Sequence, residues 1–314
     1  MIKSEICNIL GIEYPVFQGG MAWVADGKLA AAVSEGGGLG LIAAGGGDAD
    51  FVRSEIRIAK AITKKPIGVN IMLMSPFAAD IAQVVVEEGV EVVTTGAGNP
   101  AKYMDMWKAA DIKVIPVVAS VGMAKLMTKL GATALVAEGG ESGGHVGELT
   151  TMALIPQICD ATDLPVIAAG GIVDGRGVAA AFMLGACAVQ LGTRFLVANE
   201  CNIHPDYKKK VIKAGDRCTI VTGKRLGHPV RSLKTQFAKE YAKAEYSDMS
   251  DMELEAMAGG ALRLAVKEGD NLKGCFMAGQ VAAMVTKEQP AAEIIKEIMD
   301  EAEAILKGAA SVVE

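Results

Sequence analysis

Aromatic side chains and positive charge are both scarce in this sequence of 314 residues: aromatics make up 4% of it, and the formal net charge is −6. Proteins that bind single-stranded nucleic acid combine stacking aromatic rings with a basic groove. Nucleic-acid binders in general carry a basic footprint. Because the sequence lacks both features, we expect no nucleic-acid partner.

Paired cysteines, a signal peptide and a long hydrophobic run are also missing. The six cysteines are scattered and form no C-x-x-C pair, so the sequence indicates neither a zinc site nor a disulfide framework. The first ten residues, MIKSEICNIL, lack the apolar core of a secretory signal. The longest apolar stretch, residues 178–191, contains Gly185 and Gln190 and is too short to span a bilayer. We therefore expect a cytoplasmic protein with no membrane partner.

Short apolar runs are abundant instead, in a chain that is 51% hydrophobic and holds 37 glycines. Eight runs, mostly about 20 to 27 residues apart, repeat at the length of one strand–helix unit. Each run is continuous rather than alternating, as is typical of parallel strands buried on both faces. The eight predicted strands cover residues 15–18, 39–43, 66–72, 90–95, 113–118, 132–137, 165–169 and 188–192.

Eight such units predict an α/β fold, a closed (β/α)8 TIM barrel. The competing fold is a doubly wound open sheet, but no G-x-G-x-x-G follows the first run. Residues 199–289 are richer in charge and mostly lack strand signals, and helical patterns fit 233–244 and 251–266. We expect them to form a small, mainly helical cap over the barrel mouth; a mere surface excursion is the alternative. The barrel then comprises residues 1–198 and 290–314, with a last helix at 291–306.

Glycine clusters follow almost every predicted strand, at the end where barrels build their active sites. The pair Gly170–Gly171 follows the seventh strand, and Gly192–Thr193 follows the eighth. Barrels commonly hold phosphate groups in these two loops, where glycine lets backbone N–H groups approach a ligand closely. The sequence predicts a phosphate site there, unless the glycines only form tight turns.

His145 differs from the other two histidines, because it lies in the glycine-rich loop after the sixth strand. A histidine at a barrel mouth has little core to satisfy it, and its ordinary pKa suits proton transfer near neutrality. We expect His145 to be functional, and we interpret His204 and His228, which neighbour prolines, as structural. Glu138 and Glu141 lie close to His145 in sequence, and either orient it, contact a ligand or face solvent.

Seven segments spread over the whole predicted barrel form a recognisable set. They are FQGGMAWVAD (17–26), GGLGLIAAG (37–45), GVNIMLMSP (68–76), VVTTGAGNP (92–100), AEGGESGGHVG (137–147), IAAGGIVDG (167–175) and VQLGTRF (189–195). Together they resemble the flavin-dependent barrel family of nitronate monooxygenases and enoyl-acyl-carrier-protein reductase II (FabK), and the later MAGQ (277–280) also fits. GGMAWVAD, NIMLMSP and TTGAGNP are more similar to the FabK branch, whereas GG-H-x-G and LGTRF are shared by both branches.

This resemblance implies an FMN cofactor, NADH or NADPH as the reductant, and a trans-2-enoyl thioester on acyl carrier protein as the substrate. His145 matches the family's catalytic histidine. The resemblance further implies a homodimer and a monovalent cation (K⁺ or NH₄⁺) held by carbonyl oxygens, for which we favour residues 217–229. The FMN phosphate would contact Gly170, Gly171, Gly192 and Thr193, and the ring would lie near Gly20, Met21, Ala22, Asn70 and Gln190, close to Glu138, Gly143 and Gly144.

Two other functions remain open at this point: a nitronate monooxygenase that oxidises nitroalkanes with oxygen, and a non-catalytic regulator that binds a phosphate ligand. For the reductase, the acidic carrier protein needs a local basic patch on an enzyme that is itself acidic. The predicted cap supplies candidates, although lysine runs are also typical of a solvated helix face. They are Lys208–Lys210, Lys213, Lys224–Arg225, Arg231 and Lys234.

Overall fold

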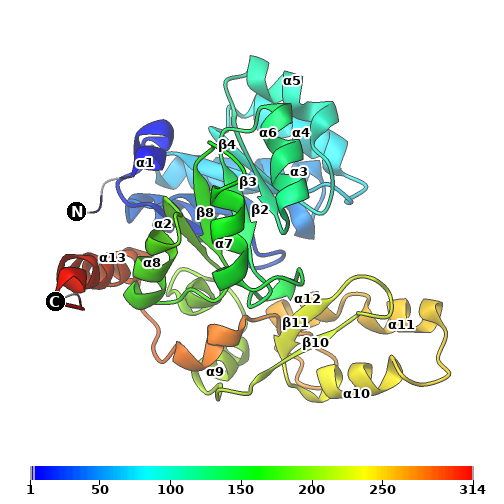
Figure 1. Ribbon diagram of the computed structural model, residues 1–314. Coiled ribbons are helices and arrows are strands. Elements are labelled where there is room, and N and C mark those ends of the chain that lie inside the picture. Colours follow the sequence, from blue (N-terminus) through cyan, green and yellow to red (C-terminus); the bar gives the residue numbers. More distant parts are fainter. Residues whose placement is uncertain (1, 3, 313–314) are drawn as a thin grey trace.

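The structure, a computed structural model that describes residues 2 and 4–312, is built around a ring of eight parallel strands (Figure 1). Their order around the ring is β1-β9-β8-β6-β5-β4-β3-β2. Each of the eight predicted runs coincides with one of these strands, with β4 and β6 each ending one residue beyond its run, so the (β/α)8 barrel is confirmed. The strands are β1 (Val16–Gln18), β2 (Gly40–Ala43), β3 (Ile67–Met72), β4 (Val92–Gly96), β5 (Lys113–Val118), β6 (Leu135–Glu138), β8 (Val166–Ala169) and β9 (Ala188–Leu191).

The ring closes between β1 and β2, where the strand pairing is shortest. Backbone bonds join the amide of Gln18 to the carbonyl of Leu39 (3.0 Å) and the amide of Leu39 to the carbonyl of Val16 (2.9 Å). The fully buried side chain of Gln18 extends this seam, because its amide group donates to the carbonyl of Leu41 and accepts from the amide of Leu41, both at 3.2 Å. The Gln18 side chain thus takes the place of the next backbone hydrogen bonds between β1 and β2.

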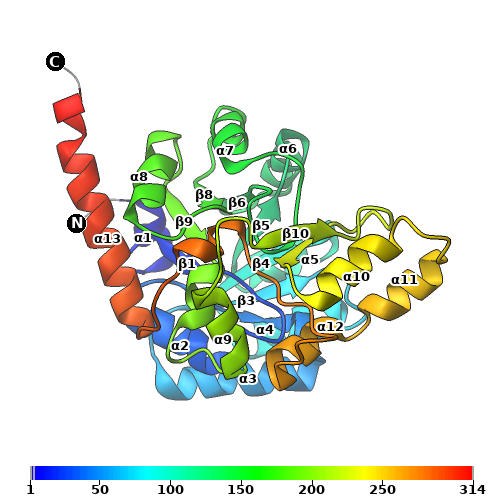
Figure 2. The ribbon, with the colours of Figure 1, turned by 90° about the horizontal axis from the view of Figure 1, so that it is seen from below.

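Helices surround the ring, and several begin at a capping side chain. Asp26, Asp48, Ser120 and Asp174 each accept a hydrogen bond from a first-turn amide, which satisfies donors that a helix start leaves free. The last helix packs along α8 and against α2 (Figure 2). The outer helices are α2 (Gly27–Glu35), α3 (Ala49–Ile62), α4 (Ala78–Glu87), α5 (Ala101–Ala109), α6 (Val121–Leu130), α7 (Thr151–Cys159), α8 (Gly175–Met183) and α13 (Ala291–Gly308).

The interior of the barrel is a packed apolar core rather than a pore. Phe17, Leu41, Ile115 and other inward side chains fill it. The N-terminal helix α1 (Glu5–Leu10) joins the same cluster through Ile6 and Leu10. Because apolar side chains fill the barrel below, polar chemistry is confined to the end where the strands lead into their loops.

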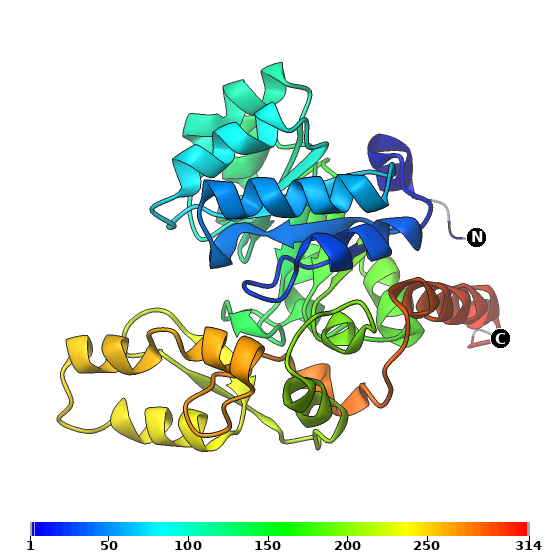
Figure 3. The ribbon, with the colours of Figure 1, turned by 180° about the vertical axis from the view of Figure 1, so that it is seen from behind.

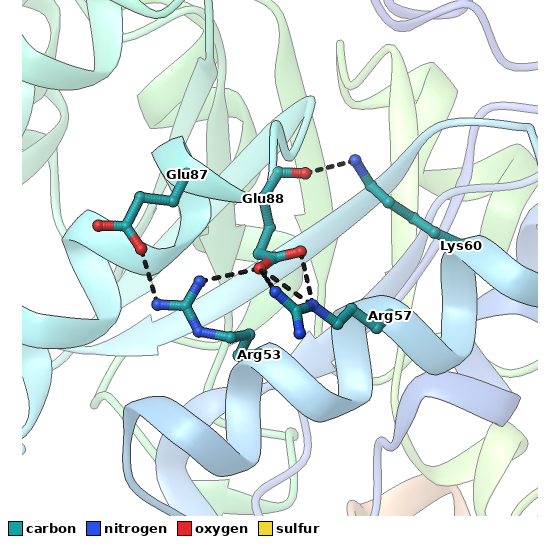
Figure 4. Close-up of polar contacts among 5 residues, drawn as sticks. All are labelled: Arg53, Arg57, Lys60, Glu87 and Glu88. Atoms are coloured by element: carbon teal, nitrogen blue, oxygen red, sulfur yellow. Dashed lines mark hydrogen bonds and ion pairs between the residues drawn. The ribbon is translucent and has the colours of Figure 1, made fainter.

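A charged network ties α3 to α4 on the outer surface (Figure 4). Glu88, directly after α4, accepts from Arg53 and Arg57, and Arg53 also pairs with Glu87. Lys60 donates to the carbonyls of Glu88 (2.6 Å) and Gly89 (2.7 Å). These contacts hold the C-terminal end of α4 against α3, and the adjacent arginines lower the pKa of Glu88.

The segment between β9 and α13 lies at one end of the barrel, with two helices projecting to one side (Figures 1 and 3). It is mainly helical, as expected. The helix predicted over 251–266 is broken, because Gly260 takes a positive φ of 74°. The elements are η2 (Thr193–Val197), α9 (Pro205–Ile212), α10 (Gln236–Ala244), α11 (Asp251–Ala258), α12 (Ala261–Arg263), the π-helical η3 (Leu264–Glu268) and η4 (Gln280–Met284). Two further short 3-10 helices lie outside the segment between β9 and α13. They are η1 (Ala44–Gly46) and η5 (Ala309–Val312).

The cap also contains a hairpin that the sequence analysis did not predict. Its strands, β10 (Thr219–Thr222) and β11 (Val230–Leu233), are four residues long. The hairpin forms a three-stranded sheet with β7 (Gly144–His145), a two-residue strand in the loop after β6. Because that third strand comes from a distant part of the chain, no local pattern indicates the sheet.

Replacing Gln18 with leucine should destabilise the barrel, because both peptide groups of Leu41 that face the seam lose their partner. We expect the free energy of unfolding to fall by about 2–5 kcal/mol, the cost of leaving two buried polar groups unpaired. Urea unfolding followed by circular dichroism measures this. Gln157→Leu, on the exposed face of α7, is the control and should change stability by less than about 0.5 kcal/mol. Equal effects of the two substitutions would contradict a role for the Gln18 side chain in closure.

Candidate active site

A cavity of about 740 Å³ lies between the carboxyl ends of the barrel strands and the cap. Its lining includes every residue that the sequence analysis assigned to the site, so residues spread over 174 positions of the chain converge on one space. These are Gly20, Met21, Ala22, Asn70, Glu138, Gly143, Gly144, His145, Gly170, Gly171, Gln190, Gly192 and Thr193. The strand-end glycines thus line one shared cavity rather than separate surface turns.

The turns after β8 and β9 use glycine for different reasons. Gly170 and Gly171 have positive φ angles of 89° and 73°, and a Cβ atom on Gly170 would lie 2.6 Å from the carbonyl oxygen of Gly139. The fold itself therefore requires glycine at position 170. Gly192 has an ordinary φ of −105°, and the nearest atom to a Cβ there would be Met21 Sδ at 3.7 Å. The fold leaves room for a side chain at position 192. The lack of one there therefore allows a ligand in the cavity to approach the backbone closely.

The backbone amides of Gly170, Gly171 and Gly192 find no acceptor among residues 2 and 4–312. Three N–H groups on adjacent turns, all lining one cavity, make a cradle for an anion. The hydroxyl oxygen of Thr193 accepts from the amide of Gly279 at 2.8 Å, which leaves its proton free to donate. This end of the cavity has the donor set that a phosphate group requires.

Polar groups at the ends of β3 and β9 line another part of the cavity. Asn70 accepts a hydrogen bond from Thr94 through Oδ1 at 2.9 Å, so its NH₂ group is left to donate elsewhere. The segment after β1 packs tightly there, since a Cβ atom on Gly20 would lie 2.2 Å from Asn70 Cβ. Gln190 Oε1 is buried and has no hydrogen-bond partner in the described protein. Buried polar atoms are normally paired, so Gln190 Oε1 points to a missing polar partner in the cavity.

Glu138 ends β6 in the same register as Ala169 and Gln190 on the next two strands. Its carboxyl group accepts one hydrogen bond, from Ser142 Oγ at 3.1 Å. Burial raises the pKa of Glu138 from 4.5 to about 7, against a smaller lowering by Ser142. A carboxyl group that changes charge near neutrality therefore faces the cavity.

His145 is held by the cap. It lies in β7 opposite Val230 of β11, and the next amide, that of Val146, donates to the carbonyl of Pro229 at 3.0 Å. The imidazole is exposed on the cavity wall. Surrounding protein lowers the pKa of His145 below its usual 6.5, and the charge of neighbouring His228 adds to this effect. The neutral imidazole therefore dominates at pH 7.

Glu141 positions loops rather than the histidine. Its carboxylate accepts from the amide and the hydroxyl of Thr151 at the start of α7, each at 2.9 Å. The hydroxyl of Thr151 also lies 2.8 Å from the carbonyl of Gly170, and the carbonyl of Glu141 accepts from the amide of Gln280 at 2.9 Å. Within the described residues neither Glu141 nor Glu138 hydrogen-bonds His145. Of the roles left open by the sequence, Glu141 braces loops and Glu138 faces the cavity.

The cap contributes cavity residues that sequence reasoning missed or interpreted otherwise. His228, interpreted as structural, lines the cavity near His145, and Leu262 and Met277 line it too. The sequence places Met277 in MAGQ (277–280), a segment of the family resemblance, but gives no signal that His228 or Leu262 reaches the cavity, because their positions depend on how the cap packs. His204 is structural as expected: its Nδ1 caps α9 by accepting from the amide of Asp206 at 3.2 Å.

The basic patch predicted on the cap is present only in part: Lys213, Lys224 and Lys234 are exposed, whereas other members make contacts within the protein. Lys208 is 8% exposed and donates to the carbonyl of Ala198 at 2.7 Å. Arg225 pairs with Asp251 at 2.9 Å. Arg231 donates to the carbonyl of Gly140 at 2.8 Å, which braces the loop that carries His145. Three of the predicted docking residues are therefore occupied by contacts within the protein.

The described residues contain no cluster of three or more His, Cys, Asp and Glu side chains suited to a metal ion. A cation held by carbonyl oxygens, the kind that the resemblance implies, would not form such a cluster and stays a prediction. Among the helices of residues 2 and 4–312, none has the length and apolarity needed to cross a membrane.

This chain is similar to known proteins over its whole length. A model of the nitronate monooxygenase family matches residues 3–301. FabK from Thermotoga maritima is 47% identical, with a TM-score of 0.97 and complete coverage of both chains. Nitroalkane oxidase from Streptomyces ansochromogenes is 27% identical, with a TM-score of 0.86, over 98% of this chain and 99% of the other. A (3aS,4S,5R,7aS)-5-hydroxy-7a-methyl-1-oxo-octahydro-1H-indene-4-carboxyl-CoA dehydrogenase from Mycobacterium tuberculosis is 32% identical, over 100% of this chain and 99% of its own.

Replacing Glu138 with glutamine should remove a pH dependence of stability. Because its folded pKa of about 7 exceeds 4.5, the neutral carboxyl group stabilises the fold below pH 4.5, and this contribution is lost as the pH rises through about 7. We expect the free energy of unfolding of the ligand-free protein to fall by up to about 3 kcal/mol over this range relative to Glu138→Gln. Urea unfolding at several pH values measures it. Glu148→Gln, an exposed control, should follow the wild type; the same pH slope in Glu138→Gln would contradict the burial of an ionisable group.

Proposed function

The chain belongs to the nitronate monooxygenase family, and we propose that within it the protein is an FMN-dependent enoyl reductase of the FabK type. It takes electrons from NADH or NADPH and reduces trans-2-enoyl thioesters carried by acyl carrier protein, the last step of the fatty-acid elongation cycle. The observation that carries this proposal is the 47% identity to Thermotoga maritima FabK over the whole of both chains. The homodimer and the monovalent cation (K⁺ or NH₄⁺) belong to the proposal on the strength of the resemblance.

The cavity residues fit FMN. The free amides of Gly170, Gly171 and Gly192 suit a single phosphate group, and the sequence has no G-x-G-x-x-G for an adenylate half after the first strand. Asn70 and Gln190 offer a donor and an acceptor to the polar edge of a ring. The volume of about 740 Å³ lies within the range of small-molecule sites.

FMN, when bound, supplies hydride chemistry, and the protein supplies positioning and proton transfer. Reducing the enoyl double bond adds a hydride at Cβ and a proton at Cα. His145 donates that proton in its imidazolium form. Because its pKa is lowered, His145 must take up a proton from solvent before each donation, and its exposure on the cavity wall permits this.

A nitronate monooxygenase is the second candidate, and the same histidine favours it. A neutral imidazole is a base, which suits removal of a proton from a nitroalkane. The family model carries that name, and the nitroalkane oxidase is similar in fold, though only 27% identical. A phosphate-binding regulator without catalysis is the third, non-enzymatic alternative.

Anaerobic stopped-flow spectroscopy in two half-reactions tests the proposal and the role of His145 together. We expect NADH or NADPH to bleach the yellow protein, and a short enoyl thioester of N-acetylcysteamine to restore the colour. Bleaching by a nitroalkane but not by a nicotinamide would identify the monooxygenase. A protein that binds no flavin, even after reconstitution, would leave the regulator.

His145→Ala should keep its flavin and its bleaching rate, while reoxidation by the enoyl thioester slows by about 10²–10⁴-fold, the usual share of general acid catalysis. In the wild type, reoxidation should slow as the pH rises through the lowered pKa of His145, because the donor is the protonated form. Unchanged reoxidation in His145→Ala would assign the proton to another group.

Gly192→Ala separates the needs of the cofactor from those of the fold. The added Cβ meets nothing closer than 3.7 Å in the protein, so the melting temperature of the ligand-free protein should stay near that of the wild type. Because the methyl group projects into the cavity, we expect the Kd for FMN to rise about tenfold or more. Flavin fluorescence measures the Kd, and chromatography of the released flavin should show FMN rather than FAD. Gly215→Ala, where no atom lies within 4 Å, is the control; an unchanged Kd in Gly192→Ala would exclude phosphate binding at this turn.

A further inference from the structure

Helix α6, whose Met123 lines the cavity, has an unusual outer face. Its buried face consists of Ala124 and Met127, and its sequence, VGMAKLMTKL, contains no acidic residue. Lys125 and Lys129 are exposed one turn apart, and Leu126 beside them is 42% exposed. The outer face of α6 is thus basic and apolar at once.

Lys125 and Lys129 are free, unlike Arg225 and Arg231 of the cap. Neither lysine makes an ion pair or a side-chain hydrogen bond with any described residue. By contrast, Lys108 on α5 donates to the carbonyl of Leu130 at 2.6 Å. Their charge is therefore available to a partner.

Apolar side chains continue from α6 toward α7. Leu149, just before α7, and Met152, in its first turn, are exposed, as are Met123 and Leu126 of α6, and α6 and α7 pack together. We call these four residues the apolar rim. Exposed apolar side chains on one face mark an interaction site, and Met123 connects the apolar rim to the cavity, whose lining it joins.

We propose that the outer face of α6, together with the apolar rim, is the docking surface for acyl carrier protein. This inference rests on the proposed function and names the surface through which its substrate arrives. The carrier is strongly acidic, so a chain with a net charge of −6 must offer it a local basic surface. α6 offers two free lysines without a compensating carboxylate, next to apolar side chains that a helix of the carrier can cover.

The position of α6 suits delivery of an acyl chain. Met123 lines the cavity, and Lys125 and Lys129 follow it by about 3 Å and 9 Å along the helix axis. A carrier seated on the two lysines therefore holds its thioester arm at the cavity opening.

A second copy of this chain suits the surface less well. In a twofold contact centred on α6, the same patch meets itself, and Lys125 and Lys129 would face their own counterparts. Like charges without acidic partners oppose such a contact.

Charge reversal at both positions tests the docking surface. Lys125→Glu/Lys129→Glu should lower kcat/KM for an enoyl-acyl-carrier-protein by about tenfold or more at low salt, with a smaller loss at high salt. Reduction of the enoyl N-acetylcysteamine thioester should be unchanged, which also shows that the variant folds. Lys125→Ala/Lys129→Ala should give a smaller loss in the same direction.

The matched control lies on α10, where Lys239 and Lys243 are exposed at the same four-residue spacing. Lys239→Glu/Lys243→Glu should leave both substrates unaffected. A larger loss in this cap variant, or an equal loss of both substrates in the α6 variant, would overturn the proposal. A dimer that dissociates only in the α6 variant, seen by light scattering, would also overturn it, because α6 would then be a subunit interface.

Failure of the proposed function is distinguishable from failure of the docking surface. If the wild type does not reduce the N-acetylcysteamine thioester, the enoyl reductase assignment fails. Docking is then judged by binding alone, with holo-acyl carrier protein titrated into the wild type and both variants by calorimetry. Binding lost only in the α6 variant supports the surface, and binding equal in all three overturns it.

Discussion

The antiparallel pairing of β7 with β11 is the interaction on which the candidate site depends. The loop after β6 is rich in glycine and contains no helix, so it has little structure of its own. Pairing of His145 with Val230 fixes its outer end, and Arg231 fixes its inner end through the carbonyl of Gly140. A Cβ atom on Gly143 would lie 2.6 Å from the backbone of Ala278, so the loop is also pressed against the segment that returns from the cap. The cap therefore builds the site as well as covering it.

Polar and apolar groups are separated by depth in the barrel. Below the cavity the interior is filled by side chains such as Phe17 and Ile115, and no polar ligand can enter. At the level of Glu138, Asn70 and Gln190 the strands end, and polar atoms face an open space. Unpaired polar groups in an apolar surrounding are costly, so the raised pKa of Glu138 and the unpartnered Gln190 oxygen mark a site shaped for a polar ligand. The free amides of Gly170, Gly171 and Gly192 extend the same pattern to the turns after β8 and β9.

The mouth of the barrel has two different sides. On one side the cap hairpin places His228 near His145, and two of its cations, Arg225 and Arg231, make contacts within the protein. On the other side α6 and the start of α7 leave two lysines and the apolar rim exposed. The two sides therefore differ in how far the fold has already paired their cations. The net charge does not reveal this difference, because paired and free cations contribute equally to it.

The sequence by itself determined the barrel and part of its cavity lining. Continuous apolar runs at a regular spacing specify buried parallel strands, and the glycines that follow those strands must share one end of the ring, so Gly170, Gly192 and His145 were predictable from local patterns. Tertiary structure alone decided what depends on distant partners. The hairpin strands β10 and β11 are too short to be recognised until β7 pairs with them, and the cavity position of His228 follows from that pairing. Likewise the sequence predicts Lys208 and Arg225 to be free surface cations. In the fold, Lys208 contacts the carbonyl of Ala198, and Arg225 contacts the carboxylate of Asp251. Local periodicity records which face of a segment is buried, whereas the partner of a charged side chain is set by packing between segments far apart in the chain.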